Sequence, residues 1–270
     1  MLVAFKNSKS MRVIVRNATR AFGRSRIPGA DYVLNPYIGC LHGCKYCYVQ
    51  ALCKRYGWSY GEWGEWVVVR RNLPKLVRGK VLSGWIYFSS LCDAYQPIEN
   101  KFKLTRSIFD SMDRLNRVCI LTKSDLILRD LDVLRKFRDV EIGLTVNSFD
   151  EKLRKFLEPR AASMEKRLNT LKTIKEEGFR CFGFISPVIP YVSDVEEVLN
   201  DLKDITDYVI VEILNPCVKD FVKWLKDNYP ESYEVLIDKN KFWSFIRSLK
   251  DLADGLGVKA EIYYRIRQLK

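Results

Sequence analysis

Three cysteines that lie close together in the sequence are the residues whose types and spacing best suit chemistry. Cys40, Cys44 and Cys47 form a CxxxCxxC pattern inside the string NPYIGCLHGCKYCYVQ. Three thiolates on one short loop can bind three irons of a cubane 4Fe–4S cluster. The fourth iron then has no protein ligand, so a small molecule can chelate it.

Two other uses of these thiols stay open. A structural zinc ion takes four ligands, usually in two pairs, and Cys53 or His42 would complete the set only with an unusual spacing. We expect His42 to be an exposed loop residue because a glycine follows it. A ferredoxin-like carrier would need a fourth cysteine to close the cluster. A zinc- or cluster-bearing nucleic-acid-binding protein is therefore the alternative to an enzyme.

The cysteine string resembles that of the radical S-adenosylmethionine (SAM) superfamily, in which the amine and carboxylate of SAM occupy the open iron. The resemblance implies that one electron from the reduced cluster cleaves SAM to methionine and a 5′-deoxyadenosyl radical. It also implies a reducing partner of the ferredoxin or flavodoxin type. Tyr46 stands just before the third cysteine, where the superfamily usually touches the adenine.

Longer strings resemble the spore photoproduct lyase-like subgroup, often labelled DNA repair photolyase. They span residues 31–190 and are NPYIGC, HGCKYCYVQ, DAYQPIE, LTKS and LEPRAASMEKRLNTL. One departure is that members of the subgroup often have Thr at the position of Cys92 and Pro at that of Ala94. The resemblance implies hydrogen abstraction from a carbon, with a nucleic-acid lesion as the nearest named substrate. RNA, a peptide or a small metabolite are the alternatives.

Strand-like and helical stretches alternate along most of the chain. The expected strands are 31–39, 84–90, 117–122, 140–148, 179–190 and 207–215, with helical stretches at 101–115, 126–138 and 163–178. This alternation is typical of parallel βαβ units, and no GxGxxG string follows any strand. We expect an α/β fold, a partial (β/α)6 TIM-like barrel of the radical SAM type with a C-terminal helical appendage.

The expected organisation has three parts. Residues 1–30 form a basic N-terminal arm or edge hairpin, residues 31–215 form the barrel, and residues 216–270 form an extension packed on it. The extension should hold helices near 219–228 and 239–254 and a last strand, VKAEIYY.

Polar residues at the carboxyl ends of the expected strands are the candidate SAM ligands, because barrel enzymes build their sites at that end. They are Ser89, Ser90, Lys123, Asn147, Ser148 and Ser186. Arg160 could pair with the methionine carboxylate. The alternative for each is a helix cap or surface turn, and a cap suits Ser124, Asp150, Ser163 and Asp194.

Cys92 follows the second long strand and is a candidate hydrogen-atom donor, since an S–H bond is weaker than most C–H bonds. Spore photoproduct lyases resemble this arrangement, with a cysteine near that strand end and tyrosines flanking the third cluster cysteine. Tyr46 and Tyr48 match those tyrosines, whereas Cys92 lies about two positions late. The catalytic candidates are thus Cys92, Tyr46 and Tyr48. The alternative for Cys92 is a small buried filler.

Composition indicates a globular chain with an anionic partner. The 46 Lys and Arg exceed the 33 Asp and Glu, for a net charge of +13, and nucleic acid is the obvious polyanion. Arg70, Arg71, Lys75 and Arg78 follow an aromatic-rich stretch at 56–66, which could stack bases or simply pack as a loop. We find no apolar stretch long enough for a membrane span or signal peptide and expect a cytoplasmic protein of unassigned oligomeric state.

Overall fold

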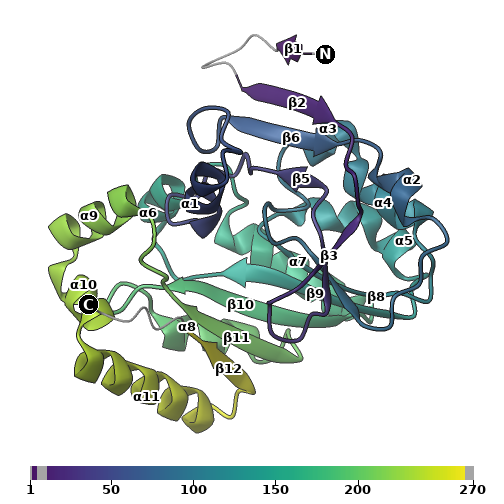
Figure 1. Ribbon diagram of the computed structural model, residues 1–270. Coiled ribbons are helices and arrows are strands. Elements are labelled where there is room, and N and C mark those ends of the chain that lie inside the picture. Colours follow the sequence, from purple (N-terminus) through teal and green to yellow (C-terminus); the bar gives the residue numbers. More distant parts are fainter. Residues whose placement is uncertain (1, 5–10, 265–270) are drawn as a thin grey trace. The chain divides into compact units, whose positions relative to one another are not determined.

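The computed structural model describes residues 2–4 and 11–264 (Figure 1). The chain divides into two compact units. The first unit comprises Met1–Gly43, Leu52–Gly143 and Arg160–Ala162, and the second Cys44–Ala51, Leu144–Pro159 and Ser163–Lys270. The division falls inside the cysteine string, between Gly43 and Cys44. Each half of that string is therefore held by its own unit.

Eight strands are hydrogen-bonded in the order β12-β11-β10-β9-β8-β7-β4-β3. Within the first unit β4 pairs with β7 and β7 with β8, and within the second β10 pairs with β11, all in parallel. β3 pairs antiparallel with β4. The strands are β3 (Phe22–Arg24), β4 (Tyr32–Leu34), β7 (Trp85–Phe88), β8 (Arg117–Thr122), β9 (Asp139–Val146), β10 (Arg180–Val188), β11 (Tyr208–Ile213) and β12 (Ala260–Tyr263). The expected parallel α/β arrangement is confirmed.

The expected single strand at 31–39 is wrong, because the segment is split between two sheets. β4 ends at Leu34, and β5 (Tyr37–Ile38) pairs antiparallel with β6 (Trp66–Arg70) in a separate four-stranded sheet. Pro36 has no N–H to donate to a ladder. The side chain of Asn35 instead accepts hydrogen bonds from the backbone of residues 90 and 91, each at 2.8 Å. The break turns the chain towards the cysteines.

The N-terminal residues contribute strands of this four-stranded sheet, which has the order β1-β2-β6-β5. β1 (Leu2–Ala4) pairs antiparallel with β2 (Arg12–Arg16), and β2 pairs in parallel with β6. Val13 is buried in the core. Residues 12–16 therefore lie between two hydrogen-bonded neighbours.

Short helices complete the first unit. The expected helix at 101–115 is broken at Lys103, whose φ of 47° lies in the left-handed region. The helical stretch expected at 126–138 begins as a 3-10 turn. The elements are α2 (Leu73–Val77), α3 (Glu99–Phe102), α4 (Leu104–Ser111), η1 (Asp125–Asp130) and α5 (Leu131–Leu134). α1 (Tyr48–Arg55) follows the cysteines.

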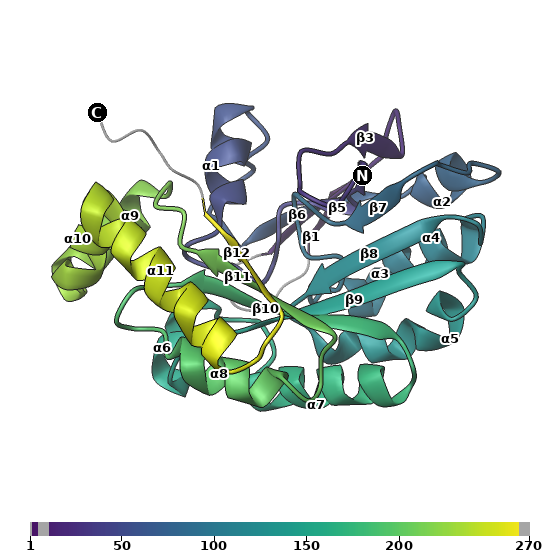
Figure 2. The same ribbon diagram turned by 90° about the horizontal axis from the view of Figure 1, so that it is seen from below.

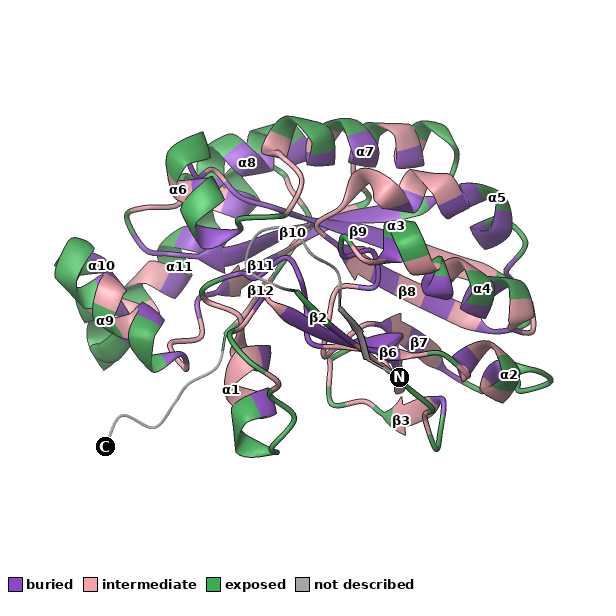
Figure 3. Cartoon of the chain, turned by 90° about the horizontal axis from the view of Figure 1, so that it is seen from above, coloured by how far each residue is buried: buried purple, intermediate pink, exposed green. Residues whose placement is uncertain are grey.

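In the second unit, helices cover one face of β10 and β11 (Figure 2). They are α6 (Glu151–Leu157), α7 (Met164–Glu176) and α8 (Val195–Leu202). α8 buries Val195, Val198, Leu199 and Leu202 and exposes its opposite side to solvent (Figure 3). That spacing is the amphipathic pattern of a surface helix.

The expected helix caps are confirmed. The side chains of Ser124, Asp150, Ser163 and Asp194 each accept a hydrogen bond from the backbone N–H two or three residues later. Such a cap satisfies one of the N–H groups that have no partner in the first helical turn. Gly178, with φ of 79°, follows the end of α7 as predicted.

Three helices and a strand lie in residues 216–264 of the C-terminal segment, the part that the structure describes. The expected helices correspond to α9 (Lys219–Asn228) and α11 (Lys239–Gly255), and α10 (Pro230–Ile237) lies between them. β12 pairs in parallel with β11, so this segment extends the sheet as well as carrying helices. No helix among the described residues is long and apolar enough to cross a membrane.

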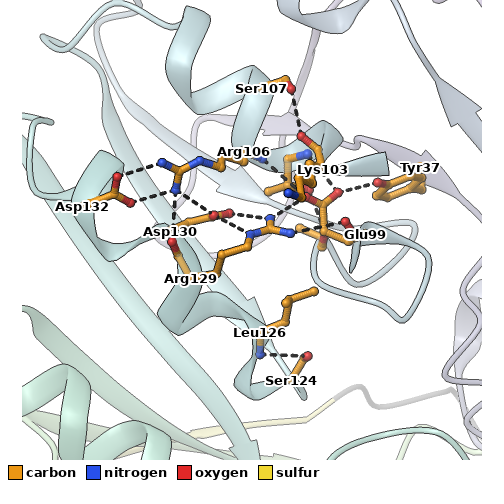
Figure 4. Close-up of polar contacts among 12 residues, drawn as sticks. Tyr37, Glu99, Lys103, Arg106, Ser107, Ser124, Leu126, Arg129, Asp130 and Asp132 are labelled. Atoms are coloured by element: carbon orange, nitrogen blue, oxygen red, sulfur yellow. Dashed lines mark hydrogen bonds and ion pairs between the residues drawn. The ribbon is translucent and has the colours of Figure 1, made fainter. Parts of the chain in front are cut away.

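A buried network of charges in the first unit anchors β5 (Figure 4). Glu99 is fully buried. Its carboxylate accepts hydrogen bonds from the Tyr37 hydroxyl, from the Thr105 amide at 3.0 Å and from Arg129 Nη2 at 2.8 Å. Arg129 Nε also donates to Asp130 at 2.7 Å. Burial, and then the charge of Glu99, raise the pKa of Tyr37, so the hydroxyl keeps its proton and remains a donor.

Replacing Glu99 should destabilise the fold strongly. Glu99→Ala leaves the buried Tyr37 hydroxyl without its acceptor and leaves Arg129 paired with Asp130 alone among carboxylates, and breaking a buried pair typically costs about 3–5 kcal/mol. Asp132→Ala is the matched control, because Asp132 pairs with Arg106 but is 60% exposed and exposed pairs are worth at most about 1 kcal/mol. Urea denaturation measures both. Equal losses for the two variants would contradict this role for Glu99.

Candidate functional site

The three cysteines lie on one loop, residues 39–47, which directly follows β5 and which we call the cysteine loop. Cys40 and Cys44 are buried and Cys47 is half-buried. The N–H of Gly43 donates to the carbonyl of Cys40, and the N–H of Cys47 to that of Cys44, both at 3.2 Å. Each half of the loop is therefore a tight turn that begins at a cysteine.

The donor set suits an iron–sulfur cluster. Thiolates are the usual protein ligands of such clusters, and three of them come from this one short loop. Among residues 2–4 and 11–264, no three His, Cys, Asp or Glu side chains converge as the ligands of one metal ion would. In a cubane cluster each thiolate binds a different iron, so the three sulfurs need not converge on one point. The case for a cluster therefore rests on the three thiols and on the loop backbone that carries them.

Close backbone packing shapes the first half of the loop. Gly39 has φ of 81°, and a Cβ there would lie 2.6 Å from the ring of Trp66. A Cβ on Gly64 would lie 2.8 Å from the Cα of Gly43 and 2.7 Å from Nη2 of Arg160. These approaches leave no room for side chains other than hydrogen.

Two side chains from elsewhere in the first unit bind the loop backbone. Gln96 is fully buried; its Oε1 accepts from the Leu41 N–H at 2.7 Å, and its Nε2 donates to the Gly39 carbonyl at 3.1 Å. Arg160 donates to the carbonyls of Leu41 and Gly64 through Nε and Nη2. Arg160, a predicted ligand of the SAM carboxylate, thus has part of its guanidinium engaged by the loop.

The expectation of an exposed His42 is wrong. His42 is 2% exposed, and its Nδ1 lies 3.6 Å from Oδ2 of Asp93. Asp93 also accepts hydrogen bonds from the Thr122 hydroxyl at 2.7 Å and the Lys123 N–H at 2.8 Å. The loop is thereby tied to the carboxyl end of β8. The glycine after His42 signals a turn, but nothing local indicates a carboxylate 51 positions away.

Serines after β7 lie close to Cys92 in the first unit. Ser90 donates its N–H to Asn35 Oδ1 and accepts from Asn35 Nδ2 at 3.3 Å. Ser89 Oγ is buried and, apart from the neighbouring Cys92 sulfur, meets no hydrogen-bond partner among the described residues. Of the two predicted SAM ligands, Ser89 therefore has the freer hydroxyl.

The Cys92 thiol retains its proton at neutral pH. Burial raises the pKa of Cys92 to about 12, against the opposing effects of Ser89, the Tyr37 backbone amide and Arg70. A thiol with so high a pKa is a poor nucleophile, but its S–H bond stays intact. Side chains that act on this thiol in the first unit are those of Ser89, Asp93 and Arg70.

Predicted residues of the second unit have different surroundings. Asn147 is buried, and its Nδ2 has no hydrogen-bond partner among the described residues. Ser148 Oγ accepts from the Asp194 N–H at 2.5 Å, at the start of α8. Ser186 Oγ donates to Glu212 Oε2 at 2.9 Å, across β10 and β11. Asn147 is thus the one of the three whose donor remains to be satisfied.

Tyr46 belongs to a buried cluster that sequence reasoning missed. Its hydroxyl donates to Glu158, which also pairs with Arg167, and both charged residues are 0% exposed. Burial, and then the charge of Glu158, raise the pKa of Tyr46 well above its ordinary value. The Lys45 N–H donates to the Leu157 carbonyl at 2.9 Å. The end of α6 therefore holds the second half of the cysteine loop. Tyr48, the other predicted tyrosine, begins α1.

Known relatives resemble the chain over most of its length. The family model described as the radical SAM superfamily matches residues 34–205. The uncharacterized protein MJ0683 of Methanocaldococcus jannaschii is 47% identical and covers 89% of this chain and 92% of its own. The uncharacterized protein ORF301 of Acidianus two-tailed virus is 28% identical, over 84% of this chain and 76% of its own.

Solved structures share the fold. A spore photoproduct lyase variant with bound AdoMet and dinucleoside spore photoproduct matches with a TM-score of 0.67 at 15% identity, covering 94% of this chain and 82% of that one. SuiB of Streptococcus suis bound to the precursor peptide SuiA matches with a TM-score of 0.53 at 14% identity, over 88% and 49%. The partial (β/α) barrel prediction is confirmed. Because the family model covers well over half of the sequence, the chain belongs to the radical SAM superfamily and is an enzyme of that superfamily.

Proposed function

We propose that the enzyme binds one 4Fe–4S cluster through Cys40, Cys44 and Cys47, with SAM at the fourth iron. The observation that carries this proposal is the cysteine loop itself. Its three thiols lie at superfamily spacing, and its backbone polar groups are satisfied by Gln96 and Arg160. The loop backbone is thereby held by groups other than the three sulfurs.

When bound and reduced by one electron, the cluster and SAM would supply a 5′-deoxyadenosyl radical that abstracts hydrogen from a substrate carbon. The electron would come from an external reductant of the ferredoxin or flavodoxin type. The buried carboxylates around the loop are already paired with cations or donors. The chain therefore holds the loop without adding unpaired negative charge there.

Most of the proposed SAM contacts come from strand ends. We rank them by how many hydrogen-bonding atoms of each side chain still have no partner. Asn147 Nδ2 and Ser89 Oγ are buried donors with unsatisfied capacity. Such groups cost free energy unless something polar meets them, so they are the strongest of the proposed ligands. Arg160 would reach the methionine carboxylate through its three remaining N–H donors, two on Nη1 and one on Nη2. Ser90, Lys123, Ser148 and Ser186 are the other proposed contacts.

We further propose that Cys92 returns a hydrogen atom to the substrate. The S–H bond breaks, a C–H bond forms on the substrate radical, and a sulfur-centred radical remains on Cys92. Tyr46 or Tyr48 would relay the exchange between Cys92 and SAM. The tyrosine O–H would give its hydrogen atom to re-form the S–H bond, and the resulting tyrosyl radical would take a hydrogen atom from 5′-deoxyadenosine, the product of SAM cleavage and hydrogen abstraction. The raised pKa of Cys92 supports this step, because the thiol must carry its hydrogen when the substrate radical forms.

The proposed substrate is a nucleic-acid lesion. The fold likeness to a lyase with a bound dinucleoside photoproduct and the net charge of +13 support it. Modification of RNA, a peptide or a small metabolite is the alternative within the same chemistry. Turnover of candidate substrates under identical reducing conditions separates these classes.

Anaerobic reconstitution should give about four irons and four sulfides per chain, as a cubane requires. Reduced protein with SAM should release 5′-deoxyadenosine. Cys40→Ala, Cys44→Ala and Cys47→Ala should each abolish that release, whereas Cys53→Ala, the matched control, should retain it. Stoichiometric zinc without iron, or full activity in any of the three loop variants, would contradict the assignment.

Cys92→Ala should keep the cluster and cleave SAM, but should divert substrate into side products because the substrate radical lacks its hydrogen donor. The assay is product analysis with dinucleoside spore photoproduct, and Cys119→Ala on β8 is the matched cysteine control. An unchanged rate and product distribution in Cys92→Ala would reduce Cys92 to a packing residue.

The raised pKa of Cys92 can be tested separately by alkylation. Only the thiolate reacts, so at pH 8 Cys92 should react with iodoacetamide more slowly than an ordinary thiol. Its rate should still be rising with pH near pH 10, where an ordinary thiol has levelled off. Peptide mass spectrometry identifies the modified cysteine. A rate that levels off near pH 9 would show that the pKa is not raised.

A further inference from the structure

Two segments of the first unit carry positive charge without any acidic residue. Residues 11–30 hold five arginines, residues 66–92 hold five lysines and arginines, and neither segment contains Asp or Glu. These two segments account for ten of the net thirteen positive charges of the chain. The cations are Arg12, Arg16, Arg20, Arg24, Arg26, Arg70, Arg71, Lys75, Arg78 and Lys80. The basic character is therefore local and is not spread over the surface.

The two segments are hydrogen-bonded to each other. β2 pairs with β6 in a register that places Arg16 opposite Arg70, and Figure 1 shows the two strands side by side. Arg70 Nη2 donates to the carbonyl of Arg20 at 2.7 Å, and the Arg71 N–H donates to that of Arg16 at 3.1 Å. We call the ten cations on these paired segments the arginine surface.

None of the ten cations forms an ion pair within the part of the chain that the structure describes. Their contacts are neutral: Arg70 Nη1 donates to the Asn35 carbonyl, and Arg71 Nε to the Asn17 side chain. Arg12 and Arg16 lie 5.8 and 5.1 Å from the centre of the Tyr60 ring. By contrast, Arg106 and Arg129 in the same unit are paired with carboxylates. The ten cations of the arginine surface are thus not compensated by ion pairs among the described residues.

Arg20 and Arg70 form the most constrained point of this surface. Burial lowers the pKa of Arg70, and the charge of Arg20 lowers it further, while Cys92 acts in the opposite direction. Like charges held together in a partly desolvated place are unfavourable until an anion joins them. The guanidinium groups retain donors beyond those used for carbonyls. A phosphate fits both requirements.

We propose that the arginine surface binds the phosphate backbone of a nucleic-acid strand, with one phosphate between Arg20 and Arg70. Eight of the ten cations are arginines, whose planar forks match phosphate oxygens bidentately. Asp31 is the acidic residue that borders both segments, through Ser25 and Trp85. Ten cations on two segments that themselves hold no Asp or Glu suit a continuous polyanion better than an acidic protein, whose carboxylates are scattered. This proposal names the surface that would hold the proposed nucleic-acid substrate. It rests on the proposed function only where the reaction is concerned, since binding can be measured without turnover.

The test measures binding of fluorescein-labelled oligothymidylate to the anaerobically reconstituted protein by fluorescence anisotropy over a series of salt concentrations. Binding should weaken steeply with salt as counterions are released. Arg20→Gln with Arg70→Gln should lower the slope of log affinity against log salt by about 0.7, since the pair holds one phosphate and each single-strand phosphate contact contributes about 0.7. Arg247→Gln with Lys250→Gln is the control, because both are exposed on α11 and the net charge falls equally.

A second pair guards against misfolding, because Arg70 is half-buried. Arg16→Gln with Lys75→Gln changes two exposed residues and should reduce the slope similarly. Unchanged thermal unfolding and iron content verify that each variant is folded. Polyglutamate is added as a competitor to represent an acidic protein, and it should compete poorly at matched charge.

Three results would overturn the inference: no oligothymidylate binding, equal effects of the control pair and both surface pairs, or polyglutamate competing as well as the oligonucleotide. SAM cleavage without added nucleic acid is measured in parallel. Cleavage without oligonucleotide binding contradicts this inference alone. Binding without cleavage contradicts the proposed function alone.

Discussion

The backbone of the cysteine loop must be satisfied by groups other than the cysteine sulfurs, and the rest of the site depends on this constraint. The sulfurs themselves are needed as ligands of the irons. The structure meets the constraint with side chains that arrive from far along the chain. Gln96 binds both Gly39 and Leu41, and Arg160 binds the Leu41 carbonyl. In the second unit the end of α6 does the same through Leu157.

The buried charges of Glu158 and Arg167 near the loop are paired with each other. This pairing distinguishes charged groups that position the loop from charged groups that are available to bind a ligand. Glu158 and Arg167 neutralise each other in full burial while Glu158 fixes the Tyr46 hydroxyl. Such pairs are weak evidence for net stability, but they orient what they touch. The arginine surface has no such partners among the described residues, and its charges remain for a ligand.

Much of the fold follows from local sequence signals. The parallel strands are apolar on both faces, and Ser163 and Asp194 are caps that the first turns of their helices require. The three cysteines could be predicted as cluster ligands from their spacing alone. The split of the strand at Pro36 could have been read from its missing N–H. A proline inside an apolar stretch argues against one continuous central strand, and this local rule is sufficient to predict the split.

The remaining features could not be read locally because they join residues far apart. The burial of His42 depends on Asp93, and the position of Tyr46 depends on Glu158, which is 112 residues away. Periodicity says which face of an element is apolar, but not which polar side chain meets which. The string that contains Glu158 and Arg167 was recognised as a resemblance, while its pairing needed the tertiary structure.

The central claim is that the cysteine loop leaves one iron of a cubane open to SAM. Electron paramagnetic resonance of the reduced, reconstituted protein tests it most directly, with and without SAM. The account predicts the signal of a reduced 4Fe–4S cluster whose g-values shift when SAM is added, because SAM changes the ligands of that iron. A cluster signal that SAM leaves unchanged, or a protein that binds zinc and gives no such signal, would contradict the account.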